Sequence, residues 1–150
     1  MVDCSVLRSK SSEASKSSES SQIDMAQIQT FRDLQVWQKA HALLLAVYKT
    51  TAAFPTNEMY GLVSQLRRAI LSVASNVVEG FHRQTVRDSL HFYNIADASL
   101  EEARYQLMVA HDLGYIDETR YTELESRASE TSRMLHGWIN SQKSNSTSPA

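Results

Sequence analysis

Glycine and proline, the residues that most often end helices and form turns, are scarce in this chain of 150 residues, which contains four glycines and two prolines. A β-rich or mixed fold of this length usually needs more turn residues, so the scarcity favours long helices. The hydrophobic fraction of 42% is sufficient for one core, and the length is typical of one domain. We therefore expect a single all-α domain.

The two ends of the chain differ in composition from the middle. Residues 1–29 are rich in serine and poor in apolar residues, so we expect a disordered arm there, and residues 144–150 predict a disordered tail. The domain is then expected over residues 30–143. The single cysteine, Cys4, lies in the arm, and no apolar run approaches membrane-spanning length. These features predict a soluble, cytoplasmic protein.

Two helices are expected in the first half of the domain. Thr30 and Asp33 have the spacing of a capping box, and Pro55 is expected to close the first helix because the residue before a proline disfavours the helical region. Thr56 or Asn57 can cap the second helix. Gly80 is expected to end it.

Two more helices are expected in the second half. Thr85 and Asp88 form another capping-box pattern, Gly114 predicts a left-handed stop, and Asp117 can cap the last helix. The predicted apolar side of the third helix contains Phe92, Ile95, Ala96, Leu100, Ala103, Leu107 and Ala110. Short connections between long helices predict an antiparallel up-down-up-down four-helix bundle.

Some apolar residues lie outside the predicted core stripes. In the third helix these are Leu90, Tyr93, Tyr105 and Met108. A helix that is apolar on two sides usually packs on two sides, which predicts a homo-oligomer. Gly137, within the fourth helix, predicts close approach of a neighbouring backbone.

Charge is distributed unevenly along a chain of net charge −2. Residues 30–87 contain seven Lys and Arg against three Asp and Glu, whereas residues 88–143 contain five against ten. A basic half joined to an acidic half suits either self-association or one face that binds a polyanion. Two ordinary solvated faces remain an equally good interpretation.

Four arginines are the candidates for contact with nucleic-acid phosphates: Arg67, Arg68, Arg83 and Arg87. Guanidinium groups bind phosphate oxygens in pairs of hydrogen bonds, so several on one face would favour a polyanion. The alternative, stronger for Arg67 and Arg68, is that they form ion pairs with Glu79, Glu101 or Glu102 within the bundle or between subunits.

A group of small and polar residues ends the second predicted helix: Ser75, Asn76, Glu79 and Gly80. Small polar side chains allow helices to approach closely and satisfy buried partners, so a structural or interface role is favoured. Ligand binding is the alternative.

No pattern of metal or nucleophilic chemistry stands out. Di-iron bundles need a Glu-x-x-His pair on each of two helices, and the nearest pattern here is Asp88-x-x-His91, in which Asp88 is better placed as a cap. Nucleophile elbows and glycine-rich phosphate loops are missing from the sequence. We expect no cofactor, no metal, no small-molecule substrate and no enzymatic activity.

Several segments together resemble one known family. They are FRDLQVWQKA, KTTAAFP, YGLVSQLRRA, SNVVEGFHR and AHDLGYIDETRY, and they occur in family order between Phe31 and Lys143. The chain resembles the four-helix bundle proteins encoded by intervening sequences in bacterial 23S ribosomal RNA genes. It departs from the family pattern at Ala74, where proline is common, and at His82, where glycine is common.

The resemblance carries expectations of its own. Family members are antiparallel four-helix bundles that assemble as barrel-shaped homopentamers, and relatives include the accessory protein of diversity-generating retroelements, which partners a reverse transcriptase and its RNA. It therefore implies a non-catalytic assembly whose partner is RNA, DNA or a protein resembling a reverse transcriptase. A purely structural protein–protein scaffold is the alternative.

Overall fold

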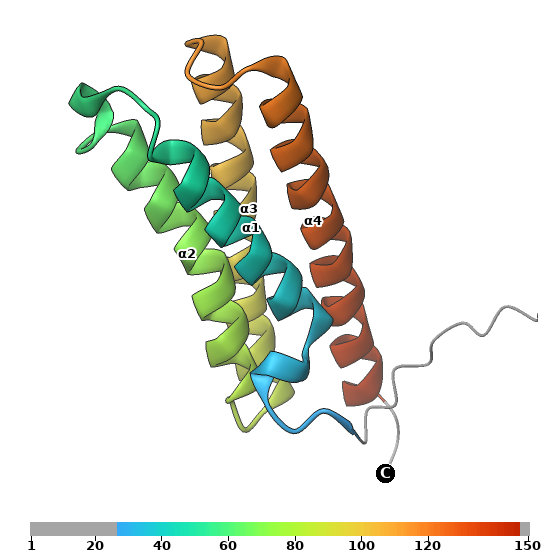
Figure 1. Cartoon of the computed structure of the whole chain (residues 1–150). Helices are drawn as coiled ribbons and strands as arrows, with labels where there is room; N and C mark the ends of the chain where they lie inside the picture. The colour runs from blue at the N-terminus through green and yellow to red at the C-terminus, as the bar shows by residue number, and fades with distance from the viewer. Residues whose placement is uncertain (1–26, 148–150) are drawn as a thin grey trace, which may run out of the picture.

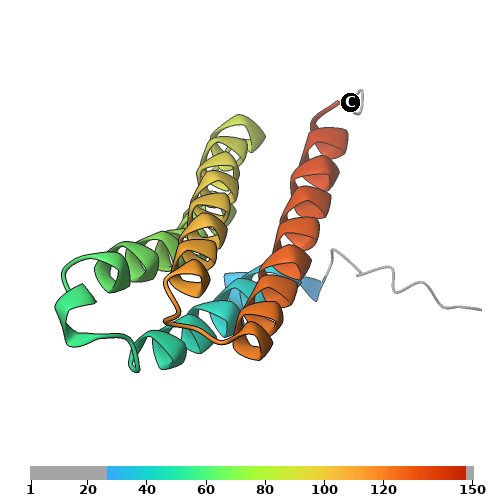
Figure 2. The same cartoon turned by 90° about the horizontal axis from the view of Figure 1, so that it is seen from above.

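The computed structural model describes residues 27–147, which form four long α-helices and no strand. The helices are α1 (Gln35–Thr51), α2 (Leu62–Phe81), α3 (Val86–Asp112) and α4 (Glu118–Ser146). Each helix packs against the next, and α4 packs against α1 and closes the bundle. The chain direction alternates between consecutive helices, as expected of an up-down-up-down bundle (Figures 1 and 2). The all-α four-helix prediction is confirmed.

The outer limits of the bundle differ slightly from the expectation. The helix α4 continues to Ser146, three residues beyond the predicted end of the domain. The predictions of disorder for the first 26 residues and for residues 148–150 fall outside the described part of the chain.

The first helix begins later and ends earlier than the sequence signals suggested. The carboxylate of Asp33 accepts hydrogen bonds from the backbone amides of Thr30 and Gln29, at 2.9 and 3.0 Å. This pair stabilises a single 3-10 turn, η2 (Phe31–Asp33), and α1 starts only after the extended residue Leu34. At its other end, α1 stops at Thr51, well before Pro55.

The second helix is capped by a residue that the sequence analysis did not select. Thr56 and Asn57 lie in a second 3-10 turn, η3 (Thr56–Glu58), and neither caps α2. Instead, Glu58 accepts a hydrogen bond from the amide of Leu62, the first residue of α2, at 3.1 Å. The other carboxylate oxygen of Glu58 accepts from the hydroxyl of Tyr115, at 3.0 Å. One side chain therefore joins the start of α2 to the α3–α4 turn.

The later helix boundaries follow the sequence signals. Gly114 has a φ of +78°, and its amide and that of Tyr115 donate to the carbonyls of His111 and Ala110, both at 2.9 Å. This is a Schellman motif, which ends α3. The side chains of Thr85 and Asp117 accept from the amides of Asp88 and Arg120 and cap α3 and α4.

The two helical glycines differ from the sequence expectation in different ways. Gly80 does not end α2 but lies buried in its last turn, where a Cβ atom would stand 2.7 Å from Cδ1 of Tyr93. Its role is to let the ring of Tyr93 approach the backbone. Gly137, by contrast, has nothing within 4 Å of its potential Cβ position among the described residues, so no backbone of the same bundle approaches it there.

The core of α3 also differs from the predicted stripe. Tyr93, placed outside the stripe, is only 1% exposed, whereas Ile95 is an exposed residue and Phe92 is half-buried. The other predicted residues (Ala96, Leu100, Ala103, Leu107 and Ala110) are buried. The true stripe passes through Ser89 and Tyr93 because the ring of Tyr93 fills the space left by Gly80.

Candidate nucleic-acid interface

The side chain of Arg67 binds the C-terminal end of α1. Its Nε donates to Oγ1 of Thr51 at 2.9 Å, one Nη donates to the carbonyl of Tyr48 at 3.3 Å, and the guanidinium lies 4.6 Å from the centre of the Tyr48 ring. A positive group at a helix C-terminus also interacts favourably with the helix dipole. These partners replace the carboxylates suggested by the sequence, and they leave Arg67 little freedom to bind a ligand.

Arg68 lies on the outer face of α2. The exposed residues Leu71, Ser75 and Glu79 follow it at intervals of three or four, so they share one stripe along the helix. Arg68 makes no ion pair with any residue in the range 27–147. Because 15 residues separate it from Arg83, the two are about 22 Å apart along the axis.

Of the four small and polar residues at the end of α2, two lie on the surface and two at the contact between α2 and α3. Ser75 and Glu79 are exposed, whereas the amide of Asn76 donates to the carbonyl and the hydroxyl of Ser72 at 2.8 and 2.9 Å. The Ser72 hydroxyl in turn bonds Oγ of Ser99 on α3, at 2.9 Å. Asn76 and Gly80 thus support the α2–α3 contact, whereas Ser75 and Glu79 lie on the outer face of α2, where Glu79 pairs with Arg83.

Arg83 and Arg87 flank the turn between α2 and α3. The guanidinium of Arg83 lies over the ring of Phe92, 4.3 Å from its centre, and forms a long ion pair of 3.5 Å with the exposed carboxylate of Glu79. Stacking on an aromatic ring holds the guanidinium in place without using its hydrogen-bond donors. Arg87 is exposed at the edge of an open depression of about 580 Å³, which Ser146 of α4 also lines.

Two further basic residues lie at this end of the bundle, and sequence reasoning did not select them. Phe31 and His82 have ring centres 6.3 Å apart, so the neighbouring Arg32 is close to the α2–α3 turn. Lys143 is in the last turn of α4, whose C-terminal end lies beside the start of α3. We call Arg32, Arg83, Arg87 and Lys143 the basic end. Local sequence could not reveal it, because η2, the α2–α3 turn and the end of α4 are far apart in the chain.

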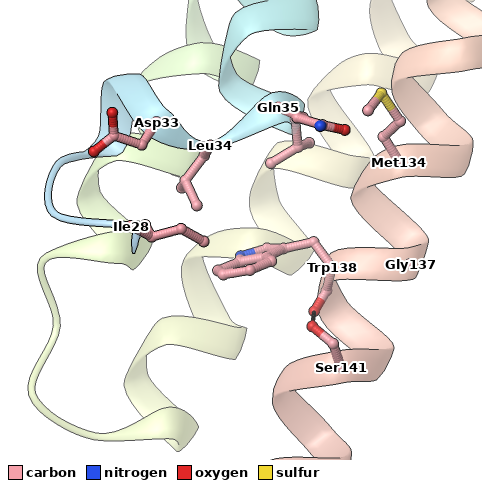
Figure 3. A pocket seen from close by; sticks show the side chains of 9 residues that line it. Ile28, Asp33, Leu34, Gln35, Met134, Gly137, Trp138 and Ser141 are labelled. Carbon is pink, nitrogen blue, oxygen red and sulfur yellow. Dashed lines mark hydrogen bonds between the residues drawn. The ribbon is translucent and has the colours of Figure 1, made fainter. Parts of the chain in front are cut away.

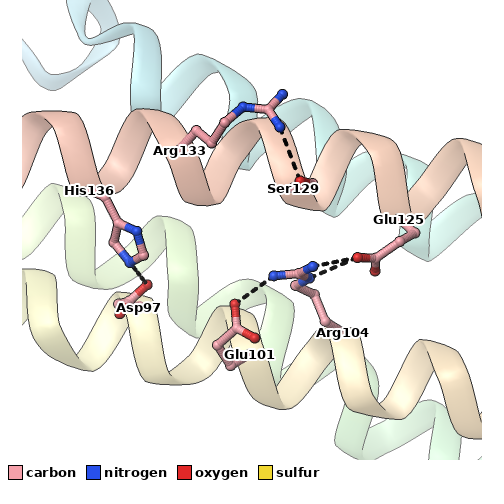
Figure 4. Close-up of polar contacts among 7 residues, drawn as sticks. All are labelled: Asp97, Glu101, Arg104, Glu125, Ser129, Arg133 and His136. Carbon is pink, nitrogen blue, oxygen red and sulfur yellow. Dashed lines mark hydrogen bonds and ion pairs between the residues drawn. The ribbon is translucent and has the colours of Figure 1, made fainter.

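Most arginines in the second half of the chain already bind carboxylates. Arg104 on α3 donates through Nε to Glu125 on α4 at 3.1 Å and through one Nη to Glu101 at 2.8 Å (Figure 4). The hydrogen bond to Glu125, assisted by Glu101, raises the pKa of Arg104 above its usual range. Arg120 and Arg127 both bind Glu123, at 2.8 and 3.1 Å. Their charge is therefore neutralised within the bundle, whereas Arg32, Arg87 and Lys143 form no ion pair within residues 27–147.

Two histidines, one on α4 and one on α3, lie against carboxylates. Nε2 of His136 lies 2.8 Å from Asp97 (Figure 4), and Nε2 of His111 lies 2.6 Å from Glu118. Within residues 27–147, no three His, Cys, Asp or Glu side chains form a cluster able to hold a metal ion. In that same part of the chain, no helix is long and apolar enough to cross a membrane.

Solved structures share this fold. Four chains match, among them a protein of unknown function from the S23 ribosomal protein family of Bacteroides thetaiotaomicron. It has a TM-score of 0.65 and 20% sequence identity over 70% of this chain and 95% of its own. No curated protein matches the chain significantly.

The sequence itself points to one family. The pattern of the family described as 23S rRNA-intervening sequence protein matches residues 32–137, which include all of α1, α2 and α3 and most of α4. The chain therefore belongs to the 23S rRNA-intervening sequence protein family.

Proposed function

We propose that this protein is a non-enzymatic, cytoplasmic, homo-oligomeric bundle that binds nucleic acid through its basic end. The observation that carries the proposal is the convergence of Arg32, Arg83, Arg87 and Lys143 at one end, where Arg83 alone has an ion-pair partner among residues 27–147. Cations gathered on one surface attract the phosphate backbone and release its counterions. Family membership supports the proposal, since these proteins are named after ribosomal RNA genes.

Of the four arginines predicted from sequence, the geometry favours two as direct contacts. Arg83 and Arg87 are exposed and adjacent, and the Phe92 ring holds Arg83 in position. Arg68 is a secondary contact for a longer strand along the outer face of α2. Arg67 is excluded from the proposed surface because α1 uses its donors.

Self-association is the second part of the proposal. Large apolar side chains remain exposed on the outer faces of the helices, among them Leu71 at 48% and Tyr105 at 62%. Burying such residues between identical subunits would remove them from water. The resemblance implies five subunits, and a ring would repeat the basic end around one rim. Light scattering coupled to size-exclusion chromatography measures the subunit number directly.

A protein–protein scaffold is the second candidate function, and the same exposed apolar residues favour it. In that case the ligand is a protein, such as a reverse transcriptase, and the arginines of the basic end contribute to its recognition without touching RNA or DNA. The two candidates differ in whether the pure protein binds an oligonucleotide.

The test is a fluorescence anisotropy titration of a structured RNA and of an RNA–DNA hybrid. The double variant Arg83→Glu/Arg87→Glu should lose binding by at least about tenfold, since each reversal replaces attraction by repulsion. The control Lys49→Glu/Arg133→Glu changes net charge equally on exposed positions of α1 and α4 and should bind almost as wild type. Equal loss in both variants, or no binding by wild type at low salt, would refute direct binding through this end.

A further inference from the structure

A small polar pocket lies beneath the α2–α3 turn, next to the basic end. It has a volume of about 260 Å³ and is lined by residues from the start of the described chain, the α2–α3 turn, α3 and α4: Ile28, Phe81, Arg83, Gln84, Thr85, Val86, Ser89, Tyr93, Trp138 and Gln142. Arg83 is the one charged residue in this lining, and no carboxylate contributes to it. The pocket therefore has the electrostatic character of an anion site.

Two residues of low exposure that carry hydroxyl groups, Ser89 and Tyr93, belong to this lining. Ser89 is 8% exposed and Tyr93 is 1% exposed, and the two residues lie one turn apart on the same face of α3. A ligand group in the pocket would supply both with a partner.

The indole of Trp138 determines which kind of partner is needed. Its Nε1 is buried and forms no hydrogen bond with residues 27–147, and its ring meets that of Tyr93 edge to face at 6.3 Å. Burial raises the pKa of Tyr93. An indole N–H can only donate, so an acceptor in the pocket would satisfy Trp138. The hydroxyls of Ser89 and Tyr93 can donate as well as accept, so the same acceptor could serve all three groups.

The adjoining apolar pocket does not offer the same chemistry. It lies between η2 and α4, has a volume of about 300 Å³, and is lined mainly by apolar groups such as Leu34, Met134 and the other face of Trp138 (Figure 3). Its polar residues, Asp33, Gln35 and Ser141, include a carboxylate. The donor-rich pocket is therefore distinct from this apolar pocket, although Ile28 and Trp138 line both.

The start of α3 adds a further attraction for negative charge. Thr85 caps the helix and lines the pocket together with Val86, the first helical residue. The N-terminus of a helix carries a partial positive charge and unpaired amides, which favour phosphate oxygens. Glu79 forms the ion pair with Arg83, and Asp88 lies in the first turn of α3.

We propose that the pocket formed by Arg83, Ser89, Tyr93 and Trp138 binds a phosphate group. This inference extends the proposed function, because the phosphate can be the terminal phosphate of the nucleic-acid strand held at the basic end. A free phosphate ester presents the same oxygens, and the experiment below separates the two sources.

Inorganic phosphate is the first probe, and Trp138 is the reporter. The variant Trp37→Phe leaves Trp138 as the one tryptophan of the chain, so its fluorescence reports on the pocket. At constant ionic strength, phosphate should shift the emission saturably, whereas chloride should not. Tyr93→Phe and Ser89→Ala, each on this background, should weaken phosphate binding about five- to tenfold, since each removes one donor. The control Ser75→Ala, on the outer face of α2, should bind phosphate as the parent does.

The second probe compares one oligonucleotide with a 5′-phosphate, a 3′-phosphate or neither. If a strand end occupies the pocket, one phosphorylated form binds at least about tenfold more tightly, and Tyr93→Phe abolishes the difference. Equal binding of all three forms together with saturable inorganic phosphate assigns the pocket to a free phosphate ester.

The inference is overturned if phosphate produces no saturable change, or if Tyr93→Phe binds phosphate as well as the parent. In the first case water satisfies the donors, and Tyr93→Phe then changes stability alone. Failure of phosphate binding with intact oligonucleotide binding refutes the pocket and leaves the proposed function standing. Loss of oligonucleotide binding with saturable phosphate refutes the proposed function and not the pocket.

Discussion

The ring of Tyr93 on α3 lies against the backbone of Gly80 on α2, where a Cβ atom would stand 2.7 Å from the ring carbon Cδ1. This contact connects the most recognisable polar segment of α2 with the buried face of α3. It also positions the Tyr93 hydroxyl in the donor-rich pocket.

Replacing Gly80 by alanine should therefore destabilise the protein. The overlap with Tyr93 costs about 1–3 kcal/mol, which exceeds the helix-propensity gain of roughly 1 kcal/mol. Gly137→Ala is the matched control, because it lies in a helix with open space around its potential Cβ and should stabilise by about 0.5–1 kcal/mol. Urea unfolding of both variants measures the difference. Equal effects of the two substitutions would show that the Tyr93 contact does not contribute to the free energy of unfolding.

Arg67 should prove to be a structural residue. Arg67→Met removes the bonds to Thr51 and Tyr48 and the stacking on the Tyr48 ring, and should lower the free energy of unfolding by about 1–2 kcal/mol. Arg68→Met, at the exposed neighbouring position, should change it by less than about 0.5 kcal/mol. If instead Arg67→Met weakened RNA binding at unchanged stability, the assignment to α1 would be wrong.

Asp33 should contribute stability in a pH-dependent way. The amides of Thr30 and Gln29 hold the pKa of its carboxyl below the ordinary value of 3.8. Because the pKa is lower in the folded state, the contribution is present above about pH 4 and is lost as the pH falls through the folded value. Asp33→Asn should thus be less stable than wild type at pH 7, and the difference should shrink towards pH 2. A difference independent of pH would contradict this origin.

Glu58 should control the ionisation of Tyr115. The hydrogen bond from the phenol to the Glu58 carboxylate, with burial and charge repulsion, raises the pKa of Tyr115 above 10.0. Glu58→Gln removes the charge, so the pKa of Tyr115 should fall towards its ordinary value. Carbon NMR of the tyrosine Cζ follows this titration. Tyr93 serves as the internal control, because burial is the main cause of its raised pKa and should be unaffected.

Local signals were sufficient to predict the later boundaries of the helices. Thr85, Gly114 and Asp117 act on amides and carbonyls within a few residues of themselves, so their spacing in the sequence determines the outcome. The same reasoning failed at Gly80 and Glu58. Gly80 responds to a ring on another helix, and the carboxylate of Glu58 binds a tyrosine 57 residues away as well as the start of α2.

The candidate site was predictable in part for the same physical reason. Arg83 and Arg87 are close in sequence and remain close around the turn. The distinction between Arg67 and Arg68 depends on which side of α2 faces α1, and the contributions of Arg32 and Lys143 depend on how the bundle closes. None of these can be read from spacing alone.

The salt dependence of RNA affinity tests the central claim most directly. If Arg83 and Arg87 contact phosphates, Arg83→Gln/Arg87→Gln should reduce the magnitude of the slope of log K against log salt concentration by about 1.5–2 for each subunit engaged. The oligomer should remain intact, and Lys49→Gln/Arg133→Gln should keep the wild-type slope. A slope unchanged by the Arg83 and Arg87 substitutions would contradict the account.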